Sequence, residues 1–189
     1  DMQPTLSLVW DLLLPGMQPA PLPADDSAAQ ALTHRLAHLA IAPPSGEVTS
    51  PLAARLTGRR FTFEPNNAAL HSLSFDFTAG RLTYRLLGGG PRRGTHSLDF
   101  APGAWVEGTT PLVLPLTTPP TVKLPLKVVS SGAWTAPDTF RLVLCQYETP
   151  FILTLDFTFA SDQVSLRARS NAGFGPLEMP LLVGAASNS

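Results

Sequence analysis

The sequence predicts a mainly β fold, in which about eight antiparallel strands close into a barrel that follows two short α-helices. Two observations lead to this fold class. After Gly58, apolar residues recur at every second position, as in antiparallel strands that bury one face and leave the other in water. Turn signals divide this region into short strands, which is typical of a barrel or a sandwich; they include Ala79-Gly80, Gly88–Gly90, Ser130–Gly132 and Ser161-Asp162.

The first predicted helix lies within "PTLSLVWDLLLPG", where Thr5 can cap the start and Pro15-Gly16 ends the pattern. Its apolar residues stand at helical spacing: Leu6, Val9, Trp10 and Leu13. The proline-rich stretch "MQPAPLPA" that follows is typical of a stiff, extended connector.

The second predicted helix lies within "DDSAAQALTHRLAHLAI", with Asp25 or Asp26 as its cap and Pro43-Pro44 as its stop. One face of this helix is apolar and carries Leu32, Leu36 and Leu39. Two amphipathic helices cannot bury their apolar faces without a partner, so we expect both to lie on a larger surface.

The alternating residues after Gly58 define the predicted core. In "FILTLDFTF", five apolar side chains share one face, and Thr154, Asp156 and Thr158 lie on the other. Four other segments supply the inward-facing Phe61, Phe63, Leu73, Phe75, Phe77, Leu82, Tyr84, Leu86, Val164, Leu166 and Ala168. Eight closed strands leave room for packed side chains or one small ligand, so we predict an up-and-down, lipocalin-like barrel. Residues 101–120 are too rich in Pro and Gly to assign.

Charge and cysteine content exclude several classes of function. The net charge is −1 and only 14% of the residues are charged, so no general basic field attracts nucleic acid. The single cysteine excludes an intramolecular disulfide and a cysteine-based metal cluster, which suits a reducing compartment such as the cytoplasm without requiring one. No apolar run approaches the roughly 20 residues of a membrane-spanning helix, so we expect no membrane span.

Three groups of residues could carry chemistry. Cys145, Tyr147 and Glu148 stand together in "LCQYETPF", and His71 or His96 could approach the thiol in space. We interpret this stretch as the turn of a hairpin in which Phe140, Leu142 and Leu144 face one way and Val143, Cys145 and Tyr147 the other.

The other two groups also have structural interpretations. His34 and His38 stand four residues apart on a predicted helix and could bind a metal from one face, but no third ligand is evident, so we expect solvated histidines. Arg92 and Arg93 lie in the glycine-rich stretch Gly88–Gly94. Phosphate-binding loops lead into a helix, whereas the residues that follow here predict a strand, so we expect a hairpin loop.

Signatures of serine hydrolases are absent from the sequence. No Ser is followed by Lys at the third position, and there is no G-x-S-x-G, Tyr-x-Asn, Lys-Thr-Gly or His-Thr-Gly. We therefore expect no catalysis by this chain alone, and we predict no catalytic residue, metal ligand or cofactor.

Several segments in this order resemble the C-terminal region of β-lactamase-related serine hydrolases, of the class C β-lactamase and penicillin-binding-protein type. These are "LVWDLLLPGM", "PLPADD", "SPLAARLTGRRFTFEPN", "LSFDF", "GAWTAPDTFRLVLCQYETPF" and "LDFTFASDQVSLRARSN". The resemblance covers residues 5 to about 185. In that bacterial family, a catalytic domain with the S-x-x-K nucleophile precedes a helical connector and a lipocalin-like β-domain.

The resemblance implies that residues 1–54 are a helical connector from an upstream hydrolase domain and that residues 55–189 are the lipocalin-like barrel. The family's nucleophile and bases have no counterpart here, so no catalytic residue is carried over. The opening "DMQPTL" lacks an initiator Met, which fits a chain cut from a longer one. The expected partner is therefore the hydrolase domain of the same protein.

Two functions for the barrel stay open at this point. The first is a non-catalytic scaffold that packs on the hydrolase domain and shapes access to its active site, for which the interior should be filled. The alternative is a module that binds a small apolar ligand, for which the interior should hold a cavity of a few hundred Å³ lined by aromatic side chains.

Overall fold

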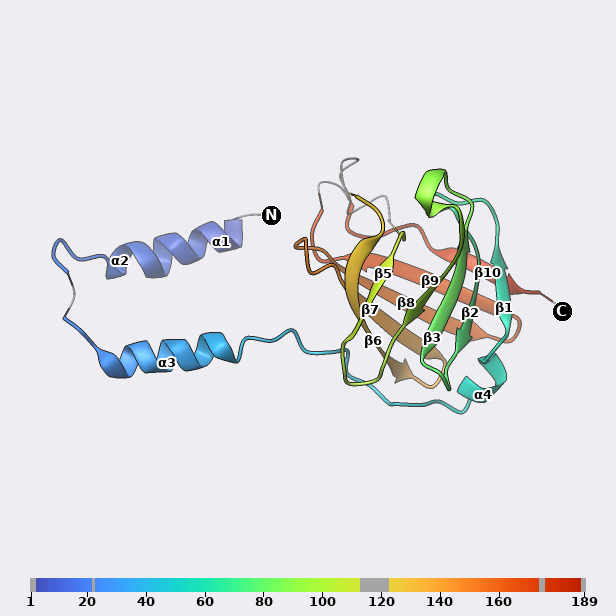
Figure 1. Cartoon of the computed structure of the whole chain (residues 1–189), viewed down its shortest axis with the longest axis horizontal. Coiled ribbons are helices and arrows are strands. Elements are labelled where there is room, and N and C mark those ends of the chain that lie inside the picture. The colour runs from blue at the N-terminus through green and yellow to red at the C-terminus, as the bar shows by residue number, and fades with distance from the viewer. Residues whose placement is uncertain (1–2, 22, 113–122, 174–175, 188–189) are drawn as a thin grey trace. The chain divides into compact units, whose positions relative to one another are not determined.

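The computed structural model describes residues 3–21, 23–112, 123–173 and 176–187. The chain divides into two compact units, Asp1–Ile41 and Ala42–Ser189. The first unit is helical, and the second consists mainly of β-strands (Figure 1). None of the helices in the described ranges is long and apolar enough to cross a membrane.

A helical segment and a separate helix make up the described part of the first unit. The segment runs through α1 (Gln3–Leu8), a π-helical stretch η1 (Val9–Leu13) and α2 (Leu14–Gly16). It ends at Gly16, as the Pro15-Gly16 pair predicts. Proline lacks the N–H that closes an α-helical turn, which accounts for irregular hydrogen bonding in the turns before it.

Helix α3 (Asp26–Ala37) begins where the sequence predicts. The Asp25 side chain accepts a hydrogen bond of 2.9 Å from the backbone N–H of Ala28, which is the interaction of an N-cap. The helix ends at Ala37, so the expected stop at Pro43-Pro44 was wrong. His38 closes the helix earlier, because its Nδ1 lies 2.6 Å from the carbonyl oxygen of His34 and satisfies that acceptor.

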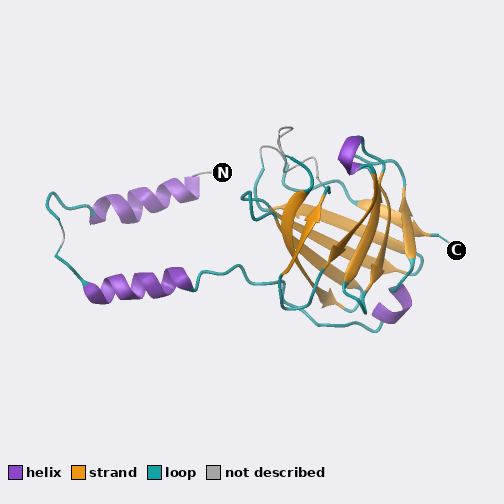
Figure 2. Cartoon of the chain, viewed as in Figure 1, coloured by secondary structure: helices purple, strands orange, loops and turns teal. Residues whose placement is uncertain are grey.

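The second unit contains a short helix, α4 (Ala53–Leu56), a 3₁₀ turn, η2 (Gly90–Arg92), and a single antiparallel sheet. Figure 2 shows the strands curving around a common interior. Within the described residues the sheet has ten strands: β1 (Arg60–Phe63), β2 (Leu70–Asp76), β3 (Arg81–Leu86), β4 (Gly94–Asp99), β5 (Val106–Thr110), β6 (Leu126–Ala136), β7 (Thr139–Cys145), β8 (Ile152–Ala160), β9 (Gln163–Ser170) and β10 (Leu182–Ala186).

The sheet is a meander that folds back on itself to make a nearly closed barrel. Its strand order is β4-β3-β2-β1-β10-β9-β8-β7-β6-β5, so neighbours in the chain are neighbours in the sheet everywhere except between β4 and β5. The pairing of β1 with β10 joins the two halves of the chain. The prediction of an antiparallel, up-and-down barrel is confirmed.

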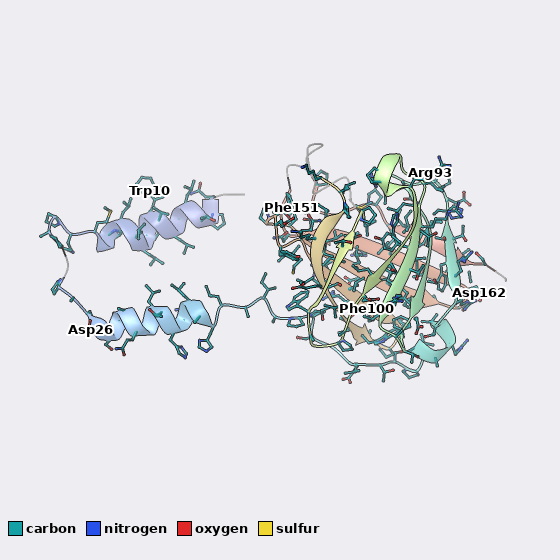
Figure 3. The ribbon with its side chains drawn as sticks, in the orientation of Figure 1. Trp10, Asp26, Arg93, Phe100, Phe151 and Asp162 are labelled. Carbon is teal, nitrogen blue, oxygen red and sulfur yellow. The ribbon has the colours of Figure 1, made fainter. Side chains whose placement is uncertain are left out.

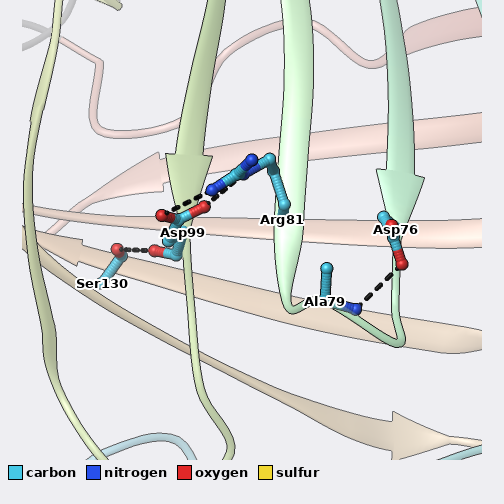
Figure 4. Close-up of polar contacts among 5 residues, drawn as sticks. All are labelled: Asp76, Ala79, Arg81, Asp99 and Ser130. Atoms are coloured by element: carbon cyan, nitrogen blue, oxygen red, sulfur yellow. Dashed lines mark hydrogen bonds and ion pairs between the residues drawn. The ribbon is translucent and has the colours of Figure 1, made fainter.

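The seam between β4 and β5 is closed by side chains and single backbone bonds. The hydroxyl of Ser130 on β6 donates to the carbonyl of Asp99 at 2.6 Å, and the hydroxyl of Ser131 donates to the carbonyl of Ala101 at 2.8 Å. Asp99 is also held to β3, because Arg81 donates two hydrogen bonds to its carboxylate, at 2.6 and 3.1 Å (Figure 4). These contacts satisfy groups at a sheet edge that would otherwise be unpaired.

The described residues form ten strands where about eight were expected. The turn expected at Ser130–Gly132 was wrong, because these residues lie within β6 and pair with β7. Strand β5 lies in the region that could not be assigned, and β10 was not predicted. Both strands are poor in large alternating side chains: β5 is "VEGTT" and β10 is "LVGAA". At Gly184 of β10 the aromatic ring of Phe63 occupies the space that a Cβ would need, so the partner strand supplies the missing bulk.

The barrel core is filled from the inward faces that the alternation predicts. All five inward-facing residues of "FILTLDFTF" (Phe151, Leu153, Leu155, Phe157 and Phe159) are buried at 9% exposure or less. Phe75 is the centre of an aromatic cluster, with ring centroids 4.9–6.2 Å from five other phenylalanines: Phe77, Phe100, Phe140, Phe157 and Phe159. Phe100 lies toward the end of the barrel that carries α4, whereas Arg93 and Phe151 lie near the other end (Figure 3).

The second unit begins before the expected domain boundary at residues 54 and 55. The backbones of Glu47 and Trp134 exchange two hydrogen bonds, at 2.8 and 2.9 Å, which add a short extended segment beside β6. The hydroxyl of Ser50 donates to the carbonyl of Pro137. The boundary expected from the sequence falls inside α4, within this unit.

Candidate functional site

The interior of the barrel has an aromatic half and an aliphatic half. The aromatic cluster fills the end near α4, and Trp134 joins it with its ring 4.9 Å from that of Phe77. Trp134 is 2% exposed, so its ring faces the core. In the other half, a cavity is lined by Ala68, Leu70, Leu73, Leu82, Tyr84, Leu112, Leu155, Phe157, Leu166, Ala168, Met179, Pro180 and Leu182.

This cavity is small and almost entirely apolar. Its volume is about 20 Å³, which is close to the smallest space that can hold one water molecule. A site for a drug-sized ligand has a volume of roughly 300–1,000 Å³. The side chains of the described residues therefore fill the interior, which is the feature expected of a scaffold.

One polar pair lies on the inward face. The hydroxyls of Tyr84 and Thr110 share a hydrogen bond of 2.6 Å, and the backbone N–H of Leu112 donates to the Thr110 hydroxyl at 3.1 Å. Burial raises the pKa of Tyr84 to about 12, against the opposing effect of its hydrogen bond with Thr110. A phenol held neutral in this way remains a hydrogen-bonding group at ordinary pH.

The Cys145 group forms the end of the β7–β8 hairpin. The backbone N–H of Gln146 donates to the carbonyl of Phe151, which closes the turn, and Tyr147 and Glu148 are exposed within it. Glu148 accepts a hydrogen bond of 2.7 Å from Lys127. The hairpin interpretation of this stretch is therefore confirmed.

Cys145 lacks the surroundings of a reactive thiol. Its side chain is buried, and burial alone raises the pKa of the thiol, which lowers its thiolate fraction. The structure does not bring either candidate histidine onto a neighbouring strand, because His71 lies on β2 and His96 on β4, whereas the neighbours of β7 are β6 and β8. His96 instead contacts the carbonyl of Arg92 through Nε2 at 3.1 Å.

The two helix histidines are exposed on α3. The rings of His34 and His38 stack with their centroids 4.1 Å apart. Within the described ranges, no three His, Cys, Asp or Glu side chains lie close enough together to hold a metal ion.

The glycine-rich stretch connects β3 to β4, as expected of a hairpin loop. Arg92 donates a hydrogen bond of 3.1 Å to the carbonyl of Ala68, which fixes the loop to the segment between β1 and β2. Gly90 has a φ of 60°, a conformation that glycine adopts without strain. Arg93 is exposed.

A polar depression on the outer face of β1 to β4 is a feature that the sequence analysis missed. It has a volume of about 100 Å³ and is lined by Arg60, His71, Ser72, Leu73, Ser74, Thr83, Tyr84, Arg85 and Thr95. The one available signal was the outward face of these strands, which carries arginine, histidine and hydroxyl residues. The pattern does not show that these side chains lie together, because that depends on the register of the four strands.

The comparisons with known proteins add no relative to this description. No family model, curated protein or solved structure matches the chain.

Proposed function

We propose that the chain is a non-catalytic accessory module of a β-lactamase-related serine hydrolase. In this proposal the barrel is a rigid scaffold, and the N-terminal helices dock it onto the hydrolase domain, where it shapes access to the active site. The filled barrel interior and the segments that resemble the C-terminal region of this family support the proposal.

The observation that carries the proposal is the apolar surface of the helical unit. Between Gln3 and Pro21, the only charged residue is Asp11. Trp10 is 64% exposed, Leu12 69% and Leu13 63%. The unit also exposes Leu6, Leu8, Val9, Leu14, Met17, Leu32, Leu36, Leu39 and Ile41. Exposed apolar surface of this kind marks a site of protein interaction.

The resemblance and the low charge of this surface support one occupant. The connector helices of the resembling family join the barrel to the hydrolase domain of the same protein, so that domain is the partner. A surface with so few charges offers little electrostatic attraction, and its affinity must come from the burial of apolar area.

The first test reads the coding sequence upstream of Asp1. We expect an open reading frame that encodes S-x-x-K, Tyr-x-Asn and a Lys-Thr-Gly or His-Thr-Gly triplet. A reading frame without a hydrolase domain would contradict the proposal at once.

The second test measures docking directly. The encoded hydrolase domain is produced separately and titrated with the present chain in a calorimeter. Replacing both Trp10 and Leu13 by Ser should weaken binding by roughly tenfold or more, because two large apolar contacts are lost. Leu181→Ser is the matched control, since Leu181 is 55% exposed on the barrel unit and should bind as the parent chain does. Equal affinity for all three proteins would show that the helices are not the docking surface.

A further inference from the structure

The polar depression on the outer face of the barrel is built from two adjacent rows of residues that cross four strands. One row pairs Arg60 with Ser74, Ser74 with Thr83 and Thr83 with Ser97. The next row runs Thr62, Ser72, Arg85, Thr95. Each row therefore carries one long basic side chain among short hydroxyl side chains, and the short ones leave the hollow.

A β-bulge adds a histidine to this hollow. The register of β2 against β3 shifts between Leu70 and Ser72, which leaves His71 as the extra residue of β2. A bulge of this kind redirects a side chain and is over-represented beside functional sites. His71 lines the depression, and its Nδ1 atom is buried with no hydrogen-bond partner among the described residues.

The donors that surround the depression have few internal partners. Ser72 is 7% exposed, yet its hydroxyl makes no hydrogen bond to any part of the chain that the structure describes. The guanidinium groups of Arg60 and Arg85 form no ion pair within the same residues. Arg59, Arg81 and Arg141, by contrast, are each paired with an aspartate. The two arginines at the hollow are thus available to bind an anion.

The charge around the depression has one sign. Among the described residues, its charged side chains are Arg60 and Arg85, and no carboxylate lines it. The acidic groups of the next row are already engaged: Asp99 accepts two hydrogen bonds from Arg81, which hold its pKa below the usual value, and Asp76 accepts the N–H groups of Thr78 and Ala79 (Figure 4). An anion in the hollow would meet two guanidinium groups, one imidazole and several hydroxyl donors.

We propose that this depression binds a tetrahedral oxyanion of the phosphate class. Arginine presents a planar fork of N–H donors that matches phosphate oxygens in pairs, and hydroxyl groups complete the coordination of the remaining oxygens. Arg60 and Arg85 approach from different strands and different rows, so they bind opposite sides of the anion. Ser72 lies at the floor, and His71 lies beside it.

The test is a titration of the ¹⁵N-labelled full chain with inorganic phosphate, followed by amide chemical shifts at fixed pH. Chloride holds the ionic strength constant, so that screening alone produces no change. We expect saturable shifts at the amides of His71, Ser72 and Arg85. A second titration uses phenyl phosphate. If phenyl phosphate binds as tightly as phosphate, the site accepts a phosphoryl group on a larger molecule. If phenyl phosphate does not bind, the site takes the free anion.

Matched variants decide whether the depression is responsible. The double variant Arg60→Gln/Arg85→Gln should weaken phosphate binding by roughly tenfold or more, since both charge-assisted forks are lost. Arg169→Gln removes an exposed arginine from the outer face of β9 and should change affinity by less than about twofold. The spectra themselves report whether each variant is folded. Shifts that do not saturate, or an equal loss of affinity in the control variant, would overturn the proposal.

Discussion

At the scale of single residues, Tyr84 shows how the barrel accommodates a polar group on its inward face. The side chain is 2% exposed, and its hydroxyl has Thr110 as a partner at 2.6 Å. A buried phenol requires such a partner, because leaving the hydroxyl without a hydrogen bond would cost about 1–3 kcal/mol. Thr110 itself accepts the N–H of Leu112, so the pair also fixes the start of the segment after β5.

The raised pKa of Tyr84 predicts a loss of stability at alkaline pH. The phenol ionises near 10 in the unfolded chain and at about 12 in the folded one. The contribution of the neutral phenol to the free energy of unfolding is therefore complete below pH 10. As the pH rises from 10 toward 12, the free energy of unfolding falls by an amount on the order of 2 kcal/mol. The sign follows because the unfolded state releases this proton first.

Two variants isolate this effect, since the chain has only two tyrosines. Urea unfolding of Tyr147→Phe, which keeps Tyr84, should show the alkaline loss. Tyr84→Phe should be about 1 kcal/mol less stable than Tyr147→Phe at neutral pH, because Thr110 loses its partner. Between neutral pH and pH 11 its free energy of unfolding should fall by less than that of Tyr147→Phe. Parallel curves for the two variants would mean that Tyr84 is ionised as easily in the folded state as in the unfolded one.

At the scale of elements, the seam between β4 and β5 decides whether the sheet is a barrel or an open sheet. Ladders of backbone hydrogen bonds join all the other pairs of neighbouring strands. Across the seam, the hydroxyls of Ser130 and Ser131 and the backbone N–H of Gly132 reach the carbonyls of Asp99 and Ala101. Ser130 and Ser131 are both fully buried, so these bonds are shielded from competing water.

Removing one of these hydroxyls should weaken the closure. Ser130→Ala leaves the carbonyl of Asp99 without its 2.6 Å bond, and we expect a loss of about 1–3 kcal/mol in the free energy of unfolding. Amide hydrogen exchange on β4 and β5 should accelerate more than exchange on β8 and β9, because the seam opens locally.

Ser97→Ala provides the control for the seam. Ser97 lies on β4 but is exposed, so its loss should change stability by no more than about 0.5 kcal/mol. Equal destabilisation by the two substitutions would show that Ser130 has no special part in closing the barrel.

At the scale of the whole molecule, the parts that sequence reasoning could predict are those set by local patterns. Alternation predicted the inward face of β8, and the carboxylates before α3 predicted Asp25 or Asp26 as its cap, of which the structure shows Asp25. Strand β10 was missed because its bulk comes from Phe63 of β1, a contact between distant segments. The polar depression was missed for the same reason, since it depends on the register of four strands and on the bulge at His71.

The division of the chain into two units yields the last prediction. Every residue of the hydrophobic core cluster lies at Ala53 or beyond, and the extended segment around Glu47 is bonded to β6. A chain that begins at Ala42 should therefore fold and unfold as the full chain does, with a free energy of unfolding within about 0.5 kcal/mol of the parent value.

A chain that begins at residue 55, the boundary expected from the sequence, loses the Glu47–Trp134 bonds, the Ser50 hydroxyl and the buried Ala53. We expect it to be about 2–4 kcal/mol less stable in urea unfolding, from two to three hydrogen bonds and the lost apolar contact. If the shorter deletion were as damaging as the longer one, the helices would belong to the folding unit of the barrel and could not be its free docking arm.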